Sequence, residues 1–598
     1  MPAAHPDQLF AEALGKHMRG ELMAAVAQYR YILQRAPQHA DTLHHLGIAY
    51  LQLGKLDEAA VWIEGSLAIN RQQPNALSNL GNCLNLLGRY QDAVVVCQEA
   101  TRADAGNDAA WTNLGNAQKA LGQIEQAQAS YSKALNLRPY EANCVYNLAN
   151  TFLDQQEFEK ARELYERCLS LNGSIPEAHH NISACLLKLR QPEAALRHAG
   201  LAIQLRADYS EAWSNQGHAL NDLQRHEDAL ASYDRLIELK PDYAEAWFNR
   251  GVTMGDLGRH EDALASYDRA LEFRRNYPEA LYNKGLWQLL KQDFLKGFET
   301  YSSRWKVKSF PTAPLQTSIP SCATSPFPER VLLWAEQGIG DEILYASMLP
   351  AALGSSSRIT LSADQRLHSI FKRSFPSLEL IDRKRTVSEI FDDGYDVQAP
   401  IGDLGRLLGV DAGKIRQSRK PYLVTDRDRV SKLKAELPFS DGRLICGISW
   451  RSANQQFGVE KSIRLTELEP LFANPDLSFV NLQYGSVDAE ISQASDLLNT
   501  EIHQVQNLDL FNDIDGLLAL IEACDLVITT SNLTAHLAGS LGKRGCVMVP
   551  LAKGRIWYWH LSDTFSLWYP SLRVFYQQDP KSWSGTINEV TNWLKDCR

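Results

Sequence analysis

A loop with two glycines followed by an acidic pair is the first candidate for chemistry. In the string VLLWAEQGIGDEILYA, Gly338 and Gly340 stand just before Asp341 and Glu342, where a helix is expected to begin. Glycine lets a substrate approach the main chain closely, and the first turn of a helix presents unpaired N–H groups. The loop therefore predicts a ligand contact. The alternative is that the two acidic residues only complement the helix dipole.

A second candidate lies in the string DLVITTSNLTAHLAGSLG, where a buried strand at residues 525–530 leads into a helix. Ser531 or Asn532 is expected to cap that helix. Its free N–H groups, with the hydroxyls of Ser531 and Thr534, could hold a diphosphate or a phosphodiester. Ligands of open α/β folds bind at such carboxyl ends of strands. His536, one turn into the helix, faces either this anion or the adjoining core.

Both candidates belong to a region in which apolar runs of strand length alternate with helical stretches. Strands are expected at residues 331–335, 358–362, 444–450, 477–483, 525–530 and 545–551. Runs that are buried on both faces and separated by helices imply parallel sheets with right-handed crossovers. The region is long enough for two such sheets, an α/β architecture.

The first half of the chain is built on a period of 34 residues. A small residue recurs at Ala13, Gly47, Gly81, Gly115, Ala149, Ser183, Gly217, Gly251 and Gly285. The spacing resembles that of the tetratricopeptide (TPR) repeat, in which two helices pack at their small residues. About nine units, residues 6–311, would stack into a right-handed superhelix with a concave face for extended partners. An ordinary helical bundle would show heptads instead.

One polar position recurs with the repeat, two residues before the small one. It holds Asn79, Asn113, Asn147, Asn181, Asn215, Asn249 and Asn283. A carboxamide can pair with both the N–H and the C=O of a peptide backbone without reading its sequence. This asparagine column resembles the asparagine ladder with which nucleocytoplasmic O-linked N-acetylglucosamine transferases hold acceptor polypeptides. The alternative is that these amides bond within and between the helices of the repeats.

Composition narrows the choice of partners. The net charge of -10 and a pI near 5.9 argue against nucleic acid, because phosphate binding requires a basic stripe. Residues 1–10 lack the basic and apolar regions of a signal peptide, and no apolar run approaches the roughly 20 residues of a membrane span. Ten cysteines without a CxxC pair fit reduced thiols. We therefore expect a cytoplasmic protein.

The glycine loop and the helix TAHLAGSLG together resemble the inverting GT-B glycosyltransferases related to lipopolysaccharide heptosyltransferases. The attached TPR repeats, and strings such as SLWYPSLRVF, further resemble bacterial TPR-glycosyltransferases, some of which modify flagellin. The resemblance implies a GT-B domain with Rossmann-like halves at residues 330–425 and 426–598, the second of which binds the nucleotide sugar. The Pro/Ser/Thr-rich residues 312–329, which can sustain neither a helix nor a central strand, form the expected linker.

The resemblance also implies roles for single residues. In that family the aspartate after the glycine loop is the proposed base, and it matches Asp341. A phosphate-contacting lysine matches Lys461, in a longer and differently composed loop, and Ser531 and Asn532 stand where heptosyltransferases have Asp and Thr. Asp341 would take the proton of an acceptor hydroxyl, and Lys461, Arg451 and the helix start would hold the charge of the departing nucleotide. The alternative for both cations is a solvated surface.

No metal or other cofactor is expected. The acidic strings at residues 426–428 and 513–515 could be mistaken for metal-binding DxD motifs, but such pairs are frequent in charged turns. Near the end of the chain, Trp557, Tyr558 and Trp559 either stack on a nucleobase or pack the C-terminal segment across the domain junction.

The sequence thus predicts a protein O-glycosyltransferase, in which an all-α TPR superhelix holds an extended acceptor and an α/β GT-B domain glycosylates its Ser or Thr. Flagellin is one candidate acceptor, and a CMP-nonulosonic acid could then be the donor. A nucleoside-diphosphate sugar is the more generic donor. Two other functions are left open: a non-catalytic TPR scaffold with a degenerate nucleotide-binding domain, and transfer to a glycolipid or polysaccharide.

Overall fold

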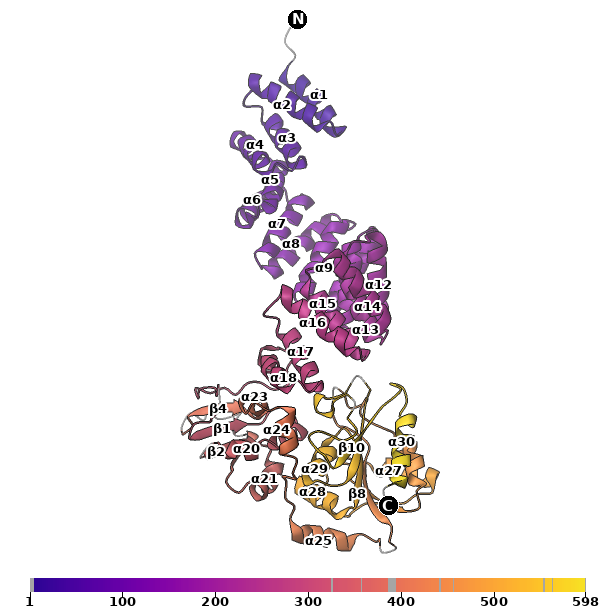
Figure 1. Cartoon of the computed structure of the whole chain (residues 1–598). Coiled ribbons are helices and arrows are strands. Elements are labelled where there is room, and N and C mark those ends of the chain that lie inside the picture. Colours follow the sequence, from indigo (N-terminus) through magenta and orange to yellow (C-terminus); the bar gives the residue numbers. More distant parts are fainter. Residues whose placement is uncertain are drawn as a thin grey trace. The chain divides into compact units, whose positions relative to one another are not determined.

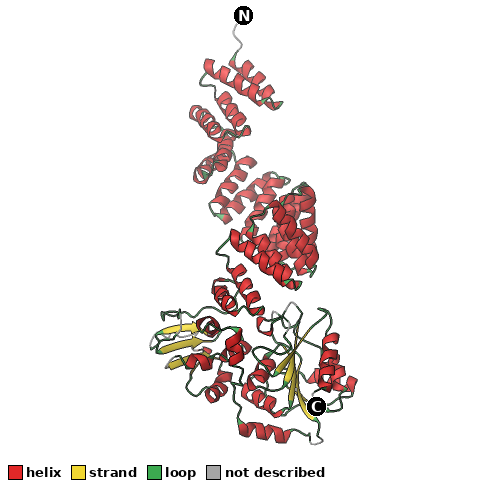
Figure 2. Cartoon of the chain, in the orientation of Figure 1, coloured by secondary structure: helices red, strands yellow, loops and turns green. Residues whose placement is uncertain are grey.

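The structure is a computed structural model that describes residues 5–323, 326–355, 358–384, 394–439, 442–454, 457–551, 554–561 and 563–596. Helices fill the first half, and helices alternate with strands in the second (Figure 1, Figure 2). The chain divides into two compact units, residues 1–241 and residues 242–598, which are described separately. Within the described ranges, no helix has the length and hydropathy of a transmembrane segment.

The first unit consists of antiparallel helix pairs, in which each helix packs against the next. Its helices are α1 (Pro6–Met18), α2 (Leu22–Arg35), α3 (Ala40–Gln52), α4 (Leu56–Ile69), α5 (Pro74–Leu86), α6 (Tyr90–Ala103), α7 (Asp108–Ala120), α8 (Ile124–Leu137), α9 (Ala142–Asp154), α10 (Phe158–Leu171), α11 (Pro176–Lys188), α12 (Pro192–Leu205), α13 (Ser210–Asp222) and α14 (His226–Leu239). This is the TPR arrangement that the 34-residue period predicts.

The small residue of the period lets the two helices of a pair approach each other. A Cβ on Gly81 would lie 2.2 Å from Sγ of Cys97, and one on Gly115 would lie 2.6 Å from Cε1 of Tyr131. The side chain sixteen positions later therefore occupies the space that a larger residue would need. A small residue is required here for packing, and at the same position of other repeats Ala149 and Ser183 are fully buried.

The second unit begins with four further helices and a 3-10 turn. These are α15 (Ala244–Asp256), α16 (His260–Phe273), α17 (Pro278–Leu290), α18 (Phe294–Tyr301) and residues Ser302–Lys306. A Cβ on Gly405 would lie 2.4 Å from Cζ of Phe298, so α18 packs tightly on the α/β region that follows. The compact-unit boundary therefore falls inside the repeat array, because its last helices share one hydrophobic core with the α/β region.

The α/β region holds two parallel sheets, with strand orders β3-β2-β1-β4 and β10-β9-β8-β5-β6-β7. The first contains β1 (Arg330–Trp334), β2 (Arg358–Ala363), β3 (Glu379–Asp382) and β4 (Val397–Pro400). The second contains β5 (Leu444–Ser449), β6 (Leu477–Asn481), β7 (Ile502–His503), β8 (Leu526–Thr530), β9 (Gly545–Val549) and β10 (Leu572–Tyr576). The expected fold class, a TPR array followed by an α/β GT-B domain of two Rossmann-like halves, is confirmed.

Helices cover both sheets. In the first half they are α19 (Ile339–Ala346), α20 (Leu349–Leu353), α21 (His368–Ser374), α23 (Leu404–Leu407) and α24 (Ala412–Gln417). In the second half they are α25 (Arg427–Glu436), α26 (Glu469–Phe472), α27 (Asp488–Leu498), α28 (Ile514–Ala523), α29 (Leu533–Leu541) and α30 (Ser584–Lys595). Short 3-10 turns lie at Gln365–Leu367, Ile401–Asp403, Leu465–Leu468 and Trp557–Trp559.

All six expected strands are present, as β1, β2, β5, β6, β8 and β9, with ends that differ by one or two residues. Sequence reasoning missed β3, β4, β7 and β10. All four stand at the ends of the strand orders, and among the described residues β4 is extended only by the isolated bridge to Ser321. Edge strands lack the long apolar run of a strand that is buried on both faces, so their pattern is weaker.

The proline-rich stretch at residues 312–329 forms no helix and no named strand in its described part, as the sequence predicts. It is nevertheless attached to the first sheet. The N–H of Cys322 donates to the carbonyl of Gln398 at 2.8 Å, and the N–H of Gln398 donates to the carbonyl of Pro320 at 2.9 Å. The stretch thus extends the sheet beyond β4 by one short bridge.

Candidate functional site

Two adjoining cavities of the second unit meet at the glycine loop. The first, here called the polar cleft, measures about 420 Å³ and lies between the two halves of the GT-B domain. The second, here called the aromatic cavity, measures about 570 Å³ and is lined by α15, α16 and α17 as well as by the GT-B domain. Both cavities are lined by Gln337, Gly338, Asp341, Arg383, Asn454, Lys461 and Tyr558. Asp341 and Lys461 therefore lie at the junction.

Asp341 stands in the first turn of α19, in the place that the sequence predicts. Its Oδ2 accepts the N–H of Gly338 at 3.2 Å, which holds the carboxylate over the glycine loop. Burial raises the pKa of Asp341 to about 6, although Lys461 favours the ionised form. A carboxyl group with such a pKa is ionised at neutral pH and still basic enough to take a proton.

Lys461 comes from the second half, in the loop after β5, and reaches the same point. The side chain is buried, and burial lowers the pKa of the Lys461 ammonium to about 8 against the opposing attraction of Asp341. The two residues are 120 positions apart in the sequence, so only the closure of the two halves brings them together. The solvated-surface alternative does not hold for this lysine.

The residue before the glycine loop has a left-handed backbone. Gln337 has φ 59°, which is uncommon for a residue with a side chain. Three hydrogen bonds hold it: its side-chain nitrogen donates to Oη of Tyr301 at 2.7 Å, its N–H donates to Oγ1 of Thr312 at 2.9 Å, and its carbonyl accepts from Arg383 at 2.9 Å. The end of the repeat array and the proline-rich stretch therefore both fix the loop conformation.

A buried ion pair anchors the strand end that leads into this loop. Arg304 donates to both carboxylate oxygens of Glu336, at 2.8 and 2.7 Å, and to Asp403 at 2.6 Å. The backbone N–H of Gly402 donates to the same glutamate at 3.0 Å. Arg304 and Glu336 are fully buried, so each charge depends on the other for compensation.

The start of α29 differs from the sequence expectation. Asn532 occupies the N-cap position, but neither it nor Ser531 caps the helix. The amide of Asn532 instead donates to Oγ of Ser449 at 2.7 Å and to the carbonyl of Arg451 at 3.0 Å. The hydroxyl of Ser531 accepts from Nε1 of Trp559 at 2.8 Å. These side chains hold the loop after β5 and the C-terminal segment, which leaves the first-turn N–H groups of α29 at the polar cleft without a side-chain cap.

The surroundings of Thr534 and His536 also differ from those expected at a simple anion site. Thr534 is fully buried, and its hydroxyl has no hydrogen-bond partner among the described residues. Both ring nitrogens of His536 face tyrosine hydroxyls, Nδ1 that of Tyr569 at 2.9 Å and Nε2 that of Tyr558 at 3.2 Å. Burial lowers the pKa of His536 to about 3, so the ring is neutral at physiological pH. Of the two alternatives from the sequence, His536 therefore fits the one in which it faces the adjoining core, although it also lines the polar cleft.

The glycine loop packs directly on this histidine. A Cβ on Gly340 would lie 2.9 Å from Cδ2 of His536, so only glycine allows α19 and α29 to approach this closely. The two strand–helix motifs that the sequence singled out are therefore in contact across the GT-B halves. The requirement for Gly340 is close packing, and a ligand contact remains a prediction.

Arg451 does not line the polar cleft. Its guanidinium pairs with Glu490 at 2.6 Å and donates to the carbonyl of Ser486 at 3.1 Å, in a separate cavity behind the loop after β5. The expected contact between Arg451 and a departing phosphate is thus not supported, because a neighbouring carboxylate takes up the charge. Arg366 and Arg383 line the cleft instead. They follow β2 and β3. Sequence reasoning missed Arg383 because β3 carries too weak a strand pattern, and it missed Arg366 although β2 was expected.

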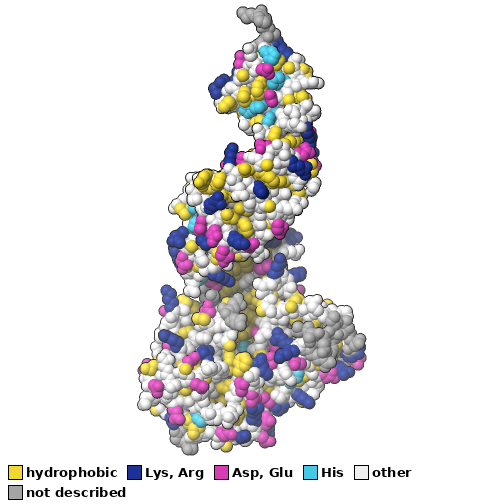
Figure 3. Space-filling view, turned by 180° about the vertical axis from the view of Figure 1, so that it is seen from behind, with side chains coloured by type: hydrophobic (Ala, Val, Ile, Leu, Met, Phe, Trp, Pro, Cys, Tyr) yellow, Lys and Arg dark blue, Asp and Glu magenta, His cyan; other side chains and the backbone are white. Residues whose placement is uncertain are grey.

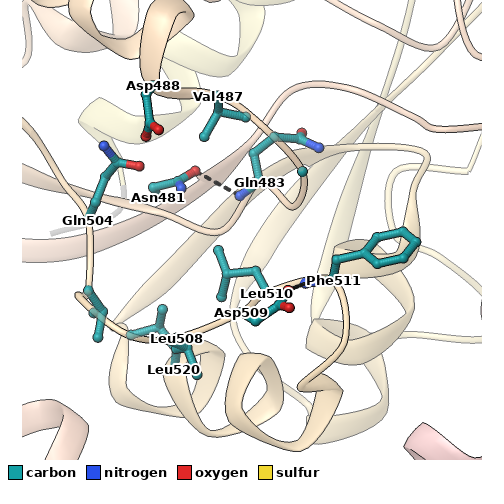
Figure 4. Close-up of a pocket in the computed structure, with 12 residues that line it drawn as sticks. Asn481, Gln483, Val487, Asp488, Gln504, Leu508, Asp509, Leu510, Phe511 and Leu520 are labelled. Carbon is teal, nitrogen blue, oxygen red and sulfur yellow. Dashed lines mark hydrogen bonds between the residues drawn. The ribbon is translucent and has the colours of Figure 1, made fainter.

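A third cavity, of about 260 Å³, adjoins the polar cleft at the carboxyl ends of β6 and β7 (Figure 4). Leu510 and Phe511 line both. Inside it, Oδ1 of Asn481 accepts the N–H of Gln483 at 2.9 Å. The side-chain oxygen of Gln483 accepts the N–H groups of Trp450 and Arg451, so it also shapes the loop that carries Lys461.

The acidic strings that mimic DxD motifs are helix caps. Asp426 accepts the N–H groups of Asp428 and Arg429 at the start of α25, both at 3.1 Å. Asp513 accepts the N–H of Gly516 at the start of α28 at 2.8 Å. These contacts agree with the reading of both strings as charged turns.

Trp557 and Trp559 are buried in packing contacts, and Tyr558 lines both the polar cleft and the aromatic cavity. The indole of Trp557 meets Phe298 of α18 edge to face, with ring centroids 5.8 Å apart. The packing alternative therefore fits Trp559 and the contact of Trp557 with α18, while Trp557 also lines the aromatic cavity and Tyr558 lines both cavities.

In the first unit, five members of the asparagine column bond to the preceding repeat through their amide nitrogens. Asn79, Asn113, Asn147, Asn181 and Asn215 contact His44, Ser78, Asn116, Tyr146 and His180, in that order, at 2.9 to 3.2 Å. Hydrogen bonds between the helices of neighbouring repeats thus account for the side-chain nitrogens of these five asparagines. The carbonyl oxygens of these five side chains accept no hydrogen bond from the described residues, so one acceptor in each repeat is left for a peptide N–H.

The other two members of the column lie in the second unit. The side-chain nitrogen of Asn283 donates to the carbonyl of Glu279 at 2.9 Å, within its own helix, and Asn283 lines the aromatic cavity. Asn249 belongs to the preceding helix pair, on α15. The last member of the column in the sequence therefore lines the same cavity as Asp341.

Comparison with protein families finds the repeats. A model described as TPR repeat matches residues 217–258 and 255–291, and two described as tetratricopeptide repeat match residues 106–172 and 17–83. The helix pairs of the N-terminal half are thus tetratricopeptide repeats.

Relatives cover only part of the chain. It is 32% identical over 320 residues to Protein FlbA of Caulobacter vibrioides, across 50% of this chain and 52% of FlbA. The chain therefore spans about half the length of this curated relative. Similar solved structures include YrrB, a TPR protein with an unusual peptide-binding site (26% identity, 32% of this chain, 98% of that chain, TM-score 0.30). Another is PilF of Pseudomonas aeruginosa (22% identity, 34% and 92%, TM-score 0.32).

Proposed function

We propose that the protein is an O-glycosyltransferase that moves a sugar from a nucleotide-activated donor to a Ser or Thr hydroxyl of a polypeptide bound by the TPR repeats. The observation that carries the proposal is the meeting of Asp341 and Lys461, from opposite GT-B halves, where the polar cleft joins the aromatic cavity. A carboxyl group of raised pKa beside a lysine of lowered pKa, both facing a cleft, is typical of acid–base sites.

The reaction follows from the order of the groups. Asp341 takes the proton of the acceptor hydroxyl as the hydroxyl oxygen attacks the anomeric carbon of the sugar. The new glycosidic bond forms while the bond from the anomeric carbon to the phosphate oxygen breaks, and the nucleotide leaves with that electron pair. Lys461 and the uncapped N–H groups of α29 stabilise the added negative charge. A single displacement of this kind inverts the configuration of the sugar.

The donor is proposed to lie along the polar cleft. Its phosphates would meet the start of α29, and its nucleoside would extend past Tyr484 and Phe511 toward the cavity of Figure 4. This placement follows the rule that open α/β folds bind ligands outside the carboxyl ends of their strands. A nucleoside-diphosphate sugar and a CMP-nonulosonic acid both fit the proposal, and the reaction would take place in the cytoplasm.

The acceptor is proposed to be a polypeptide in an extended conformation, and flagellin is one candidate. Support comes from the TPR repeats, which bind extended partners, and from the side-chain oxygens of the asparagine column. The aromatic cavity is lined by both Asn283 and Asp341, so a peptide bound at Asn283 would lie near the proposed base.

The test measures nucleotide release and transfer with a panel of nucleotide sugars and a Ser/Thr peptide. Asp341→Asn should bind the donor with unchanged affinity and lose transfer by about 100-fold or more. Asp428→Asn is the matched control, because Asp428 is also an acidic residue in the first turn of a helix but lies on α25, outside the cleft. If Asp341→Asn turns over like the control, Asp341 is not the base. Absence of donor binding across the panel would favour the scaffold, and transfer to glycolipid alone would favour a lipid acceptor.

A further inference from the structure

The wall of the aromatic cavity that belongs to the repeat array is apolar. Tyr282, Leu286 and Trp287 of α17 line it together with Tyr301 and Phe310. From this lining we infer that the cavity binds a bulky apolar side chain, Phe, Leu or a similar residue, that lies close to the acceptor Ser or Thr of the polypeptide. The inference rests on the proposed function, since it assigns the acceptor preference of the same site.

The walls are built by rings that neighbouring side chains hold in place. A Cβ on Gly255 would lie 2.7 Å from Cζ2 of Trp287, so the indole lies directly on α15. The same indole stacks on His260, with ring centroids 4.7 Å apart and planes tilted by 36°. Trp287 is therefore held in place although it is only half-buried. A rigid and partly exposed indole is a preformed contact for an apolar group.

A second part of the wall is organised in the same way. The ring of Tyr282 lies 5.7 Å from that of Tyr301 and meets Phe310 edge to face at 5.9 Å. The hydroxyl of Tyr301 accepts the bond from Gln337, the residue before the glycine loop, at 2.7 Å. This part of the wall is thus tied to the loop that carries Asp341, which fixes the distance between the apolar wall and the proposed base.

The charged groups of the cavity are already engaged or belong to the reaction. Arg383 pairs with Glu342, and Arg555 donates to the carbonyl of Pro550 and lies over the ring of Tyr576. Asp256, on α15, also lines the cavity and is engaged in an interaction of its own. A charged acceptor side chain that entered here would lose water beside aromatic rings, at a cost that an apolar side chain avoids.

A polypeptide is the occupant that the surroundings favour. Asn283, the last member of the asparagine column, lines the same cavity and uses only its amide nitrogen within its helix. Its carbonyl oxygen accepts no hydrogen bond from the described residues and can accept a peptide N–H. An acyl chain would gain nothing from that group, whereas a peptide can place its backbone on Asn283 and an apolar side chain on Trp287.

The test uses binding, so it needs no donor. The full chain is titrated into four fluorescein-labelled Gly/Ser peptides, each with a single Thr. The peptides differ only at the position beside this Thr, which is Phe, Leu, Gly or Asp. Burial of one large apolar side chain predicts that the Phe and Leu peptides bind about 10-fold or more tighter than the Gly peptide, with Asp the weakest. A fluorescence-anisotropy series gives the four dissociation constants.

Two variants connect the preference to the cavity. Leu286→Lys places a charge among the rings, and Trp287→Ala removes the main wall; both should abolish the advantage of Phe over Gly. Phe273→Ala is the matched control, because Phe273 is an exposed aromatic of α16 that does not line the cavity, and it should keep the advantage. Circular dichroism shows whether each variant folds. If either Leu286→Lys or Trp287→Ala fails to fold, the other variant provides the test.

Equal affinity for all four peptides would overturn the inference, and so would an advantage of Phe that survives in Leu286→Lys. Stronger competition by a dodecyl saccharide than by the Phe peptide would assign the cavity to a lipid instead. The proposed function is judged separately. If the protein prefers the Phe and Leu peptides but transfers no sugar from any donor, the inferred peptide site stands and the proposed enzymatic function is wrong. If the protein transfers a sugar but shows no preference for an apolar side chain, the proposed function stands and the inferred peptide site is wrong.

Discussion

The cost of holding Asp341 ionised can be measured as a change in stability. Its pKa is raised from 3.8 to about 6 by burial, so the folded protein binds this proton more tightly than the unfolded chain does. Below about pH 4 both states are protonated and the group contributes nothing. Between pH 4 and pH 6 the unfolded chain loses the proton first, so stability falls as the pH rises. Asp341→Asn removes this loss.

The magnitude follows from the shift. About two pKa units at 1.36 kcal/mol each give about 3 kcal/mol. The real gain must be smaller, because the side chain is partly exposed and because Lys461 loses an attractive partner in the variant. We therefore expect Asp341→Asn to be more stable than the parent by about 1 to 2 kcal/mol at pH 7.5, while being inactive.

The assay is urea unfolding at pH 4.5 and pH 7.5, with hydrogen exchange of peptides that cover β1 and α19 to isolate the unit that contains Asp341. The gain should shrink markedly at pH 4.5. Asp428→Asn, which removes a solvent-facing first-turn carboxylate, should give no gain at either pH. A gain that does not change with pH, or a variant that is less stable at pH 7.5, would refute the proposed burial of this charge.

Three further outcomes can be checked on the same material. The pH profile of kcat/KM should be bell-shaped, rising through about pH 6 as Asp341 loses its proton and falling through about pH 8 as Lys461 loses its charge; a flat profile from pH 5 to pH 9 would contradict both roles. Gly340→Ala should lower stability by about 1 to 3 kcal/mol and impair transfer, because its Cβ would lie 2.9 Å from His536; thermal unfolding and turnover would show whether the loop tolerates it. Arg451→Ala should change donor affinity less than about 2-fold in a calorimetric titration, because a glutamate outside the cleft already pairs with Arg451. A loss of affinity of about 10-fold would instead show that Arg451 contacts the donor.

The repeat array and the central strands could be predicted because their signals are local and periodic. A small residue at every thirty-fourth position is required wherever two helices touch, as at Gly81 and Gly115, so it is visible without the structure. The strand β1 is apolar after Arg330, the strand β8 is buried along its whole length, and each leads directly into one of the two singled-out loops. Edge strands such as β3 carry half-exposed residues and no such signal.

The sequence by itself determined the helix pairs, the two parallel sheets and the position of Asp341 at the start of α19. Only the tertiary structure decided which polar side chains face the cleft. Glu490 draws Arg451 away from it, Ser449 takes the amide of Asn532, and Lys461 becomes buried beside a carboxylate from the other half. The physical reason is that a polar side chain satisfies its hydrogen bonds and charge with whichever partner the fold brings within about 3 Å, and these partners lie tens of residues away in the sequence.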